Sequence, residues 1–485
     1  MLLKDLINDD YIKEIDVSLL DKSIEEICID SRCAGPKSLF VALKGVNQDG
    51  HDYIKDAIQR GVKVIVAERP VNGLGHFEGC LLLVEDSKRF LQEIVKKFYN
   101  DPSQKIKIIG VTGTNGKTTV TYLLESMITT AGDKCGVIGT VNYRFNNKII
   151  QAKNTTPGMP DLYKYLDQMV GHGMGFCAME VSSHALEQGR HQGLNFLAAI
   201  FTNLTSEHLD YHQTQEQYFY AKAKLFQGLA SDKLAFVNVD DPWGRRLIEM
   251  VSSKMVTYGI HNRADVQASN ITTDLSGVKF TMKKGSQEIF IDSPLIGIHN
   301  VYNILAASAA CLCIGFPEEK IQKGIKAVKN VPGRMESIYT DKDFYVFVDY
   351  AHTEDALRHA LKTLRDVATG KLIVVFGCGG DRDTTKRPKM GQVASQLADV
   401  AIVTNDNPRT EVPQQIIDEI IAGFEKKNYQ VIMDRKHAIQ EALQIAQGQD
   451  VVLIAGKGHE NYQIFKEETV PFDERAIVKD LLRQV

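Results

Sequence analysis

Short apolar segments alternate with amphipathic stretches through the last third of the chain. The apolar segments lie at 344–350, 371–377, 399–404, 429–434 and 451–456. Such short apolar runs are typical of strands that are buried on both faces. Between two of them, Ile416, Ile417 and Ile420 share one face of a helix predicted over 413–426. The alternation predicts a parallel sheet covered by helices on both sides, in a Rossmann-like domain over 331–485.

The N-terminal block, up to about residue 100, shows a shorter version of this pattern. Apolar segments at 38–43 and 62–68 predict strands, and helical stretches separate them. Pro102 and its polar neighbours interrupt the pattern over 98–104, so we predict a linker there. These features predict a small N-terminal α/β domain over residues 1–100.

The middle of the chain opens with an apolar strand, a glycine-rich turn and a helix. The predicted strand covers 105–111, and the predicted helix over 119–132 ends at Gly132, a residue suited to terminate helices. Strand, glycine turn and helix form the first unit of a nucleotide-binding α/β domain. We therefore predict a central domain over 101–330, with a parallel sheet like that of the P-loop ATPases.

Composition and charge limit the location and the partners. The 485 residues are 44% hydrophobic and 24% charged, with a net charge of −4, so we expect no nucleic-acid partner and no membrane insertion. The N-terminus is acidic where a signal peptide is basic, and the longest weakly polar run, 304–316, is too short to cross a membrane. Eight scattered cysteines without a CxxC pair predict reduced thiols. We expect a cytoplasmic monomer that acts on small molecules.

The segment GVTGTNGKTT at 110–119 is the strongest chemical signal in the chain. Backbone N–H groups in such a turn surround phosphate oxygens, while Lys117 can reach the outer phosphates and Thr118 can bind Mg²⁺. Val111 stands where the strict phosphate-loop pattern has its first glycine. A turn that binds nothing is the alternative, but the strand–turn–helix context favours ATP. The loop alone fits a kinase, a motor, a switch or a ligase.

This loop and several later segments carry a resemblance to one family. GTNGKTT at 113–119 resembles the loop of Mur ligases and folylpolyglutamate synthetases. Further motifs follow in the family's order at 179–186, 202–212, 218–226, 297–307, 333–336, 348–353 and 456–460. The segment 30–54 resembles the uridine-diphosphate end of tripeptide-forming Mur ligases, which disfavours a folylpolyglutamate synthetase. The chain departs from the family's usual pattern at Gln213 and Glu354, and neither position carries a reacting group.

The resemblance implies an ATP-dependent ligase that joins a carboxylate to an amine. ATP converts the carboxylate to an acyl phosphate and the amine then displaces phosphate, so anions must be gathered by cations. The implied catalytic residues are Lys117, Glu180, His208 and Lys222. The implied ligands of two Mg²⁺ ions are Thr118, Glu180, His208 and a carbamylated Lys222. The carbamate falls on Lys222 rather than Lys224, because the family's lysine follows the alanine after the aromatic stretch. It also replaces an ammonium that would repel the metal ions.

The implied ATP-binding residues come from two blocks of the chain. They are Gly113, Thr114, Asn115, Gly116, Lys117, Thr118, Thr119, Asn300, Asn303, Arg334 and Asp349. Neutral amides at Asn300 and Asn303 suit the edge of adenine, although asparagines also cap helices. Arg334 and Asp349 lie far along the chain from the loop, which implies that the domains close before the reaction.

The resemblance also implies a site for a UDP-linked muramoyl dipeptide. Its residues are Ser31, Asn154, Thr155, Thr156, Ser182, Gln188 and Arg190. Hydroxyls together with one arginine suit a ligand that is rich in phosphate and carboxylate. Without the resemblance, NTTPG at 154–158 indicates only a turn.

The amino acid implied by the resemblance is meso-diaminopimelate. The implied contacts are Arg382, Asp406, Asn407, Pro408, Arg409, Gly456 and Glu460. DNPR at 406–409 resembles the form found in diaminopimelate-adding Mur ligases, and lysine-adding relatives lack its arginine. Arg409 offers a bidentate fork to the second carboxylate, and Glu460 suits the distal ammonium. Such a tetrapeptide also forms plain turns, but this one follows a predicted strand, where α/β sheets place ligands.

Two other functions remain open on the sequence. The first is the same ligase with L-lysine as its amino acid. The second is a non-catalytic ATP-dependent switch, which would leave the C-terminal motifs without a role. No residue can be identified from the sequence as the general base for the attacking amine.

Overall fold

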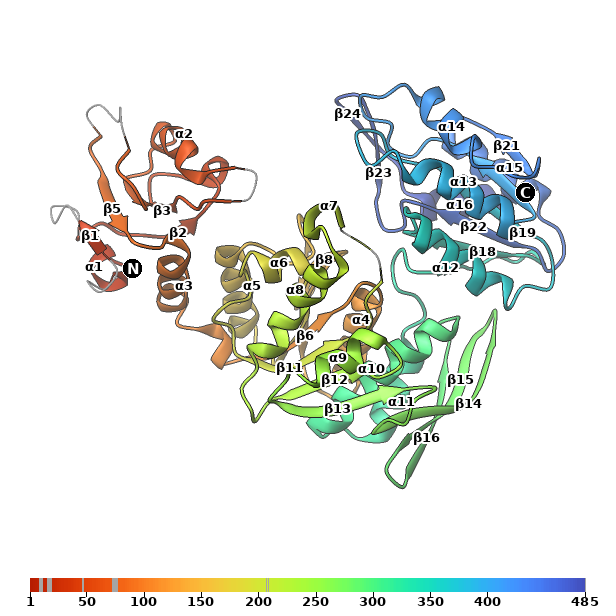
Figure 1. The fold of residues 1–485 in the computed structure, drawn as a ribbon, viewed down its shortest axis with the longest axis horizontal. Coiled ribbons are helices and arrows are strands. Elements are labelled where there is room, and N and C mark those ends of the chain that lie inside the picture. Colours follow the sequence, from red (N-terminus) through yellow and green to blue (C-terminus); the bar gives the residue numbers. More distant parts are fainter. Residues whose placement is uncertain are drawn as a thin grey trace.

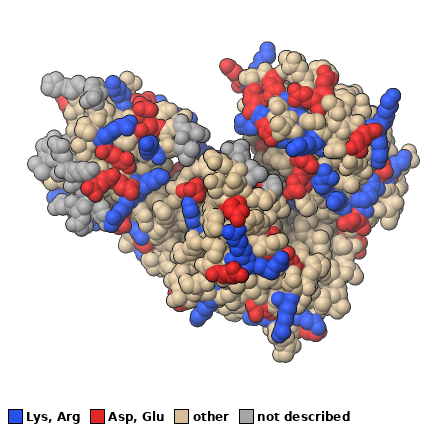
Figure 2. Space-filling view, viewed as in Figure 1, with Lys and Arg blue, Asp and Glu red and all other residues tan. Residues whose placement is uncertain are grey.

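The chain forms three lobes that follow one another along the sequence (Figure 1). The computed structural model describes residues 1–7, 12–14, 20–45, 48–71, 77–205, 207 and 209–484. The N-terminal and C-terminal lobes lie on opposite sides of the central lobe. Figure 2 shows a hollow in the surface between the two outer lobes, above the central lobe.

The N-terminal lobe is built on a five-stranded sheet in the order β1-β5-β4-β3-β2. The strands are β1 (Ile12–Glu14), β2 (Glu26–Cys28), β3 (Ser38–Val41), β4 (Val64–Ala67) and β5 (Cys80–Val84). Neighbouring strands are parallel except for β1 and β5. Its helices include α1 (Leu3–Leu6), α2 (Ile54–Gln59) and α3 (Ser87–Phe98). The strands predicted at 38–43 and 62–68 are confirmed as β3 and β4, and both are wholly buried.

The central lobe contains an eleven-stranded sheet in the order β16-β15-β14-β13-β12-β11-β6-β10-β7-β8-β9. The strands are β6 (Lys107–Thr112), β7 (Cys135–Ile138), β8 (Asn142–Phe145), β9 (Lys148–Gln151), β10 (Phe176–Glu180), β11 (Phe196–Phe201), β12 (Leu234–Asn238), β13 (Lys254–Gly259), β14 (Val266–Asp274), β15 (Gly277–Lys284) and β16 (Gln287–Ser293). The predicted parallel sheet forms the middle, from β7 to β14. Antiparallel strands extend it at both edges.

Helices cover both faces of this sheet. One face packs against α4 (Lys117–Thr130), α10 (Ile298–Ile314) and α11 (Glu318–Ala327), and the other against α5 (Met159–Gly171) and α8 (Gln215–Gln227). Shorter helices are α6 (Ser183–Glu187), α7 (Leu209–His212) and α9 (Pro242–Ile248). The helix stop predicted at Gly132 is confirmed, because this glycine follows α4 with a left-handed φ of +100°.

The C-terminal lobe is a Rossmann-like layer structure with a six-stranded sheet in the order β17-β18-β22-β19-β20-β21. The strands are β17 (Glu336–Ile338), β18 (Tyr345–Asp349), β19 (Leu372–Phe376), β20 (Val400–Val403), β21 (Tyr429–Val431) and β22 (Val451–Ala455), with a separate hairpin of β23 (Tyr462–Phe465) and β24 (Glu468–Pro471). The helices are α12 (Glu354–Arg365), α13 (Lys386–Leu397), α14 (Pro413–Ile421), α15 (Arg435–Ile445) and α16 (Glu474–Leu482). Within the six-stranded sheet all strands are parallel except β17. The predicted strands are confirmed, but α14 ends at Ile421, short of the predicted 426. Two residues later, the backbone at Gly423 lies against the Pro388 carbonyl.

The outer lobes make specific contacts with the central lobe. Lys164 of α5 pairs with Glu26 of β2 at 2.8 Å, and Tyr163 packs into the N-terminal core. On the other side, Ile296 lies within the core of the C-terminal lobe. Thr205 Oγ1 donates to Asp355 Oδ2 of α12 at 3.4 Å. Each outer lobe therefore touches the central lobe.

The weakly polar run singled out in the sequence belongs to the core, and the cysteines, all of which the structure describes, are not paired in disulfides. The weakly polar run at 304–316 lies almost entirely in α10, whose side chains fill the central core. No helix among the described residues is long and apolar enough to span a membrane. The eight cysteines, all within the described ranges, are free thiols.

Candidate active site

The site of the central lobe lies at the carboxyl ends of four neighbouring strands, β11, β6, β10 and β7. The phosphate loop follows β6, and Glu180 is the last residue of β10. Thr202 and Asn203 follow β11, and Thr140 follows β7. Parallel strands place their carboxyl ends at one sheet edge, so residues far apart in sequence meet there.

The phosphate loop is held tightly by its neighbours. Gly113 has φ +147° and a Cβ there would lie 1.9 Å from Thr202 Oγ1; Gly116 has φ +89° and a Cβ would lie 2.3 Å from Asn303 Oδ1. The backbone N–H groups of Thr114 and Asn115 donate to the Asn203 carbonyl and side chain, at 2.8 and 3.0 Å. Only glycine fits these two loop positions, which explains the spacing seen in the sequence.

Two predicted adenine contacts lie beside this loop in the first turns of α10. Asn303 Nδ2 donates to Asn300 Oδ1 at 3.0 Å, and Asn300 Nδ2 donates to the Ile296 carbonyl at 2.8 Å. Both side chains are buried. The structure thus brings the predicted amide pair to the phosphate loop, and one of its amides also binds the backbone at the start of α10.

Two lysines converge on one carbonyl of the phosphate loop. Lys222 Nζ and Lys117 Nζ donate to the Gly113 carbonyl at 2.8 and 3.0 Å, and Lys117 also donates to the Thr114 carbonyl at 2.8 Å. Lys222 is only 1% exposed, and its Nζ lies 4.3 Å from the ring centre of Tyr218. Burial lowers the pKa of both lysines, and the charge of Lys117 lowers that of Lys222 further. The geometry therefore favours a neutral amine at Lys222 and anionic ligands at the loop.

Glu180 connects the phosphate loop to the next strand. Its Oε2 accepts from Thr140 Oγ1 at 2.8 Å and from Thr118 Oγ1 at 3.2 Å, and its Oε1 accepts from the Thr140 N–H at 3.0 Å. The carboxylate is only 1% exposed. A Cβ at Gly139 would lie 2.3 Å from Oε1, so glycine makes room for this approach. One carboxylate is thus fixed beside the hydroxyl of the phosphate loop.

The donor set around Glu180 fits a hard cation. No cluster of three or more histidine, cysteine or acidic side chains within the described part of the chain is arranged to hold a metal ion. The predicted ligand His208 lies outside the described residues. One carboxylate and one hydroxyl suit Mg²⁺, which keeps several waters and shares phosphate oxygens with its substrate.

The residues predicted to bind the peptide surround Glu180 on its other side. Thr156 Oγ1 donates to the Glu180 carbonyl at 2.9 Å and accepts from the Ser182 N–H at 3.0 Å. Thr155 Oγ1 lies 3.1 Å from Thr140 Oγ1. Arg190 donates to the Thr156 carbonyl at 2.7 Å. Phosphate loop, carboxylate and peptide loop therefore form one hydrogen-bonded unit.

The remaining predicted peptide contacts lie at the border of this unit. Arg190 also holds Gln188 Oε1 at 2.6 and 2.9 Å, and the Asn154 carbonyl accepts from the Tyr143 hydroxyl at 2.5 Å. Ser31 lies buried in the N-terminal lobe, near Ile29, which faces the 154–158 turn at Gly158. The structure thus brings the turn close to the N-terminal segment predicted to bind uridine.

In the C-terminal lobe, Arg334 and Asp349 lie together at the edge facing the phosphate loop. Asp349 accepts from the backbone N–H groups of Met335 and Ala351 at 2.6 and 2.8 Å. Burial raises the pKa of Asp349, and Arg334 opposes that rise. Burial lowers the pKa of Lys117, and the charge of Arg334 adds to this lowering. The charge of Arg334 in the C-terminal lobe therefore acts on Lys117 in the central lobe.

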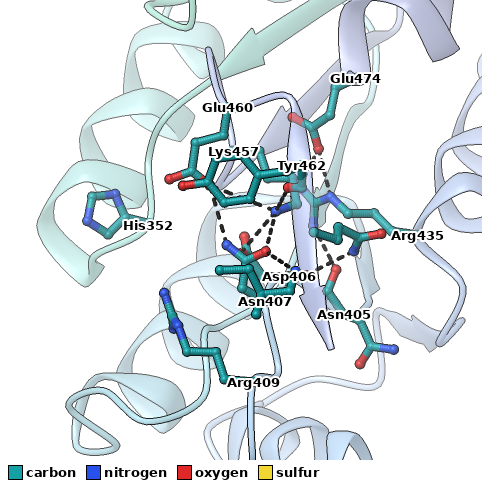
Figure 3. A network of polar contacts seen from close by, with 12 residues as sticks. His352, Asn405, Asp406, Asn407, Arg409, Arg435, Lys457, Glu460, Tyr462 and Glu474 are labelled. Carbon is teal, nitrogen blue, oxygen red and sulfur yellow. Dashed lines mark hydrogen bonds and ion pairs between the residues drawn. The ribbon is translucent and has the colours of Figure 1, made fainter. Parts of the chain in front are cut away.

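The predicted amino-acid site is formed by two loops at the carboxyl ends of β20 and β22 (Figure 3). Asn407 Nδ2 donates to Glu460 Oε2 at 3.3 Å, which links the loops. Arg409 has φ +52°, and its guanidinium donates to the Gly380 carbonyl at 2.6 Å. Figure 3 shows Glu460 and Arg409 extending on the side of the network where His352 lies. An anionic and a cationic side chain thus face the same space.

Two other predicted amino-acid contacts, Gly456 and Arg382, lie in different places relative to this network. Gly456 follows β22 with φ +126°, and a Cβ there would lie 2.6 Å from Asp406 Oδ2. Arg382 is exposed and donates to the Asp381 carbonyl at 3.1 Å, outside the network that joins the two loops.

Sequence reasoning missed several residues of these sites. Thr140 lies two residues after the apolar run 135–138, and its place after a strand adjacent to β10 was a usable signal. Lys457 lies inside the GKGHE motif but was assigned no role. Arg435 and Glu474 form a wholly buried ion pair at 2.6 Å, and no local pattern marks residues so distant in sequence as partners.

Comparisons with known proteins cover the chain from end to end. The Mur ligase family, catalytic domain, matches residues 23–99; the Mur ligase middle domain matches 111–311; and the Mur ligase, glutamate ligase domain, matches 333–458. The chain is 45% identical to the UDP-N-acetylmuramoyl-L-alanyl-D-glutamate–2,6-diaminopimelate ligase of Geobacillus kaustophilus, over 94% of both chains. It is 42% identical to the enzyme of that name from Clostridium botulinum, over 96% of both chains.

Solved structures agree with these matches. A structure of a UDP-N-acetylmuramoyl-L-alanyl-D-glutamate–2,6-diaminopimelate ligase is 32% identical, with a TM-score of 0.70 over 100% of this chain and 99% of the other. The MurF ligase from Thermotoga maritima in complex with ADP has a TM-score of 0.63 at 17% identity, over 95% of this chain and 97% of its own, and shares the fold alone.

Three α/β lobes around a phosphate loop define the protein as an enzyme that uses a nucleotide to drive a reaction at their shared cleft. The chain belongs to the Mur ligase family, since the family patterns cover most of its length and full-length relatives exceed 40% identity. It is an ATP-dependent ligase of the amide-forming class.

Thr140 offers a test of the unit around Glu180. Thr140→Val removes the hydroxyl that donates to Glu180 Oε2, so we expect the free energy of unfolding to fall by about 1–3 kcal/mol in urea denaturation. Thr140→Ser keeps the hydroxyl and is expected to lose less than half as much. Equal losses in the two variants would show that the hydrogen bond does not hold the carboxylate.

Proposed function

We propose that this enzyme joins meso-2,6-diaminopimelate to the D-glutamate carboxylate of UDP-N-acetylmuramoyl-L-alanyl-D-glutamate, with ATP converted to ADP and phosphate. The product is a peptidoglycan precursor. The observation that carries the proposal is that Arg409 and Glu460, of opposite charge, extend on the same side of the two amino-acid loops, in a chain matched over its full length by diaminopimelate ligases.

The chemistry follows from the charges of the cleft. An amide does not form from a carboxylate in water without activation, so a carboxylate oxygen attacks the γ-phosphorus of ATP and ADP leaves. The amine then attacks the acyl carbon, the bond to phosphate breaks, and the amine loses a proton. Lys117 and Arg334 stabilise the negative charge on the phosphoryl oxygens. Closure of the lobes keeps water away from the acyl phosphate.

The three lobes divide the substrates among them in this proposal. Residues 1–100 bind the uridine end through Ser31, residues 101–330 bind ATP, and residues 331–485 bind the amino acid. The peptide end lies on Asn154, Thr155, Thr156, Ser182, Gln188 and Arg190. One chain supplies every part, so the enzyme works as a monomer in the cytoplasm, where its nucleotide substrates are available.

Two Mg²⁺ ions complete the proposed site. Thr118 and Glu180 would hold one of them, while His208 and a carbamylated Lys222 would serve the second. Bound Mg²⁺ neutralises phosphate charge and orients its oxygens. The fit rests on the buried carboxylate of Glu180, which has a hydroxyl of the phosphate loop within hydrogen-bonding distance.

The carbamate on Lys222 is supported by the environment of its amine. A buried, neutral amine attacks CO₂; a nitrogen–carbon bond forms and a proton leaves. The product is an anion with two oxygens, which replaces an ammonium beside Lys117. Burial lowers the pKa of Lys222 well below its usual value, which favours the neutral amine that this reaction needs.

Lys222→Ala tests the carbamate. We expect this variant to lose most of its turnover without recovery in added bicarbonate, because the anionic ligand is gone. Lys224→Ala is the matched control, since Lys224 lies two residues away in a half-exposed pair with Glu187, and it should keep its turnover. The mass of the native protein, measured without acid or unfolding, should show the addition of one CO₂ in the unaltered protein and in Lys224→Ala, but not in Lys222→Ala. Near-normal turnover of Lys222→Ala would rule out the role.

The choice of amino acid is tested at Arg409. With ATP, Mg²⁺ and the UDP-linked dipeptide, the unaltered enzyme should give an amide product with the mass of the diaminopimelate adduct. Its kcat/KM should favour meso-diaminopimelate over L-lysine by roughly 10⁴-fold, because the Arg409 guanidinium would be left without its carboxylate in the closed site. Arg409→Ala should lose most of this preference, whereas exposed Arg483→Ala should retain it.

Two outcomes would contradict the assignment. A preference for L-lysine in the unaltered enzyme would assign it to the lysine-adding type. ATP binding without any amide product would favour the non-catalytic switch.

A further inference from the structure

A lysine is buried where the two amino-acid loops meet. Lys457 is 0% exposed, and its Nζ donates to Asn407 Oδ1 and to the Tyr462 carbonyl, each at 2.8 Å (Figure 3). The same ammonium lies 3.6 Å from Asp406 Oδ1 and 3.9 Å from Glu460 Oε2. A buried ammonium needs such partners, because desolvation penalises its charge. One cation thus contacts both loops and the hairpin that follows them.

We propose that Lys457 is a positioning residue that fixes the Asn407 amide and keeps Glu460 anionic, and so determines how tightly the distal ammonium of the amino acid is bound. The inference rests on the proposed function, in which Glu460 receives that ammonium. Lys457 itself acts through Asn407 and Glu460 rather than on the substrate.

The first part of the argument is the orientation of Asn407. Its Oδ1 faces two groups that can only donate, Lys457 Nζ and the Ile464 N–H at 3.1 Å. The Nδ2 group is therefore the one that faces Glu460 Oε2, where it donates at 3.3 Å. Without the lysine, the amide loses one of the two donors that define its orientation. Lys457 thus orients the donor that holds Glu460.

The second part is the charge of Glu460. Burial raises the pKa of Glu460, and the Asp406 carboxylate acts in the same direction, while Lys457, Asn407 and Arg409 lower it. Tyr350 and Tyr462 also face this carboxylate. Lys457 leads the groups that oppose the effect of burial. Its removal therefore favours the protonated carboxyl, which cannot pair with an ammonium.

A second buried cation, Arg435, fixes the chain segments from which the two amino-acid loops begin. Arg435 of α15 donates to the Ala455 carbonyl at 2.8 Å and to the Asn405 carbonyl at 3.3 Å, and it pairs with the buried Glu474. Asn405 and Ala455 immediately precede the two amino-acid loops. The strand ends are therefore fixed by Arg435, and Lys457 sets the charge and orientation within the loops.

The experiment compares Lys457→Met with Lys436→Met. Methionine keeps most of the length of lysine without its charge, and Lys436 is an exposed lysine next to Arg435 in the same lobe. For Lys457→Met we expect KM for meso-diaminopimelate to rise roughly 30-fold, with kcat and the KM for ATP within about twofold of the unaltered enzyme. Lys436→Met should match the unaltered enzyme in all three quantities.

The pH dependence separates this role from a merely structural one. The anionic form of Glu460 binds the ammonium, and its pKa is higher without Lys457. Binding should therefore weaken as pH falls through that raised pKa, so the KM defect of Lys457→Met should grow as the pH is lowered. A KM defect that does not change with pH would contradict the proposal.

A double-mutant comparison with Glu460→Gln completes the test. If Lys457 acts through Glu460, adding Lys457→Met to Glu460→Gln should raise KM for meso-diaminopimelate much less than it does in the unaltered enzyme. If the two substitutions instead raised KM by independent factors that multiply in the double variant, that result would overturn the proposal. So would loss of ATP binding in both Lys457→Met and Lys457→Gln, because it would assign the lysine to folding alone.

The outcomes also separate this inference from the proposed function. If the unaltered enzyme forms no amide with meso-diaminopimelate, the proposed function fails first. If it does, and Lys457→Met behaves like Lys436→Met, only the role of Lys457 fails.

Discussion

The site of this enzyme depends on cationic side chains that gather beside the phosphate loop. Lys117 donates to the Gly113 carbonyl, and Arg334 of the C-terminal lobe adds its charge to the same environment. The buried Lys222 amine donates to the same carbonyl, and burial lowers its pKa. Neighbouring cations repel one another until anions arrive. In the proposed reaction ATP and the peptide carboxylate supply these anions, so substrate binding and closure of the lobes are expected to stabilise one another. Glu180 supplies a fixed anion within this field, and it ties the loop to the residues proposed to bind the peptide.

The C-terminal lobe must also match the charges of its substrate, and it uses different residues to do so. Its substrate is proposed to carry two ammonium groups and two carboxylates, so the site needs both signs of charge at a defined spacing. Arg409 and Glu460 provide them from separate loops. Lys457 and Arg435 lie behind the loops and hold them through the Asn407 side chain and the carbonyls of Asn405 and Ala455. In this proposal, recognition of the amino acid relies on two buried cations, Lys457 and Arg435. They hold the loops in place and do not contact the amino acid themselves.

Much of this architecture could be predicted from the sequence, because its causes are local. The apolar runs predicted β3, β4, β6 and β18 to β22, and the glycine-rich segment predicted the turn after β6, where the structure leaves no room for a Cβ at Gly113 or Gly116. The antiparallel edges of the central sheet and the early end of α14 at Ile421 were not predicted, since both depend on tertiary packing. The same reason hid Thr140 and the Arg435–Glu474 pair, whose partners are brought together only by strand order. Family motifs supplied the remaining site residues, including Arg382, which lies exposed outside the network.

The central claim is that triphosphate and peptide carboxylate react directly in the cleft beside Glu180. The most direct measurement uses UDP-linked dipeptide with oxygen-18 in both oxygens of the D-glutamate carboxylate that is to be joined. If an acyl phosphate forms, each amide formed should be accompanied by one phosphate carrying a single labelled oxygen. Amide formed together with unlabelled phosphate, with the displaced labelled oxygen found in water, would contradict this account.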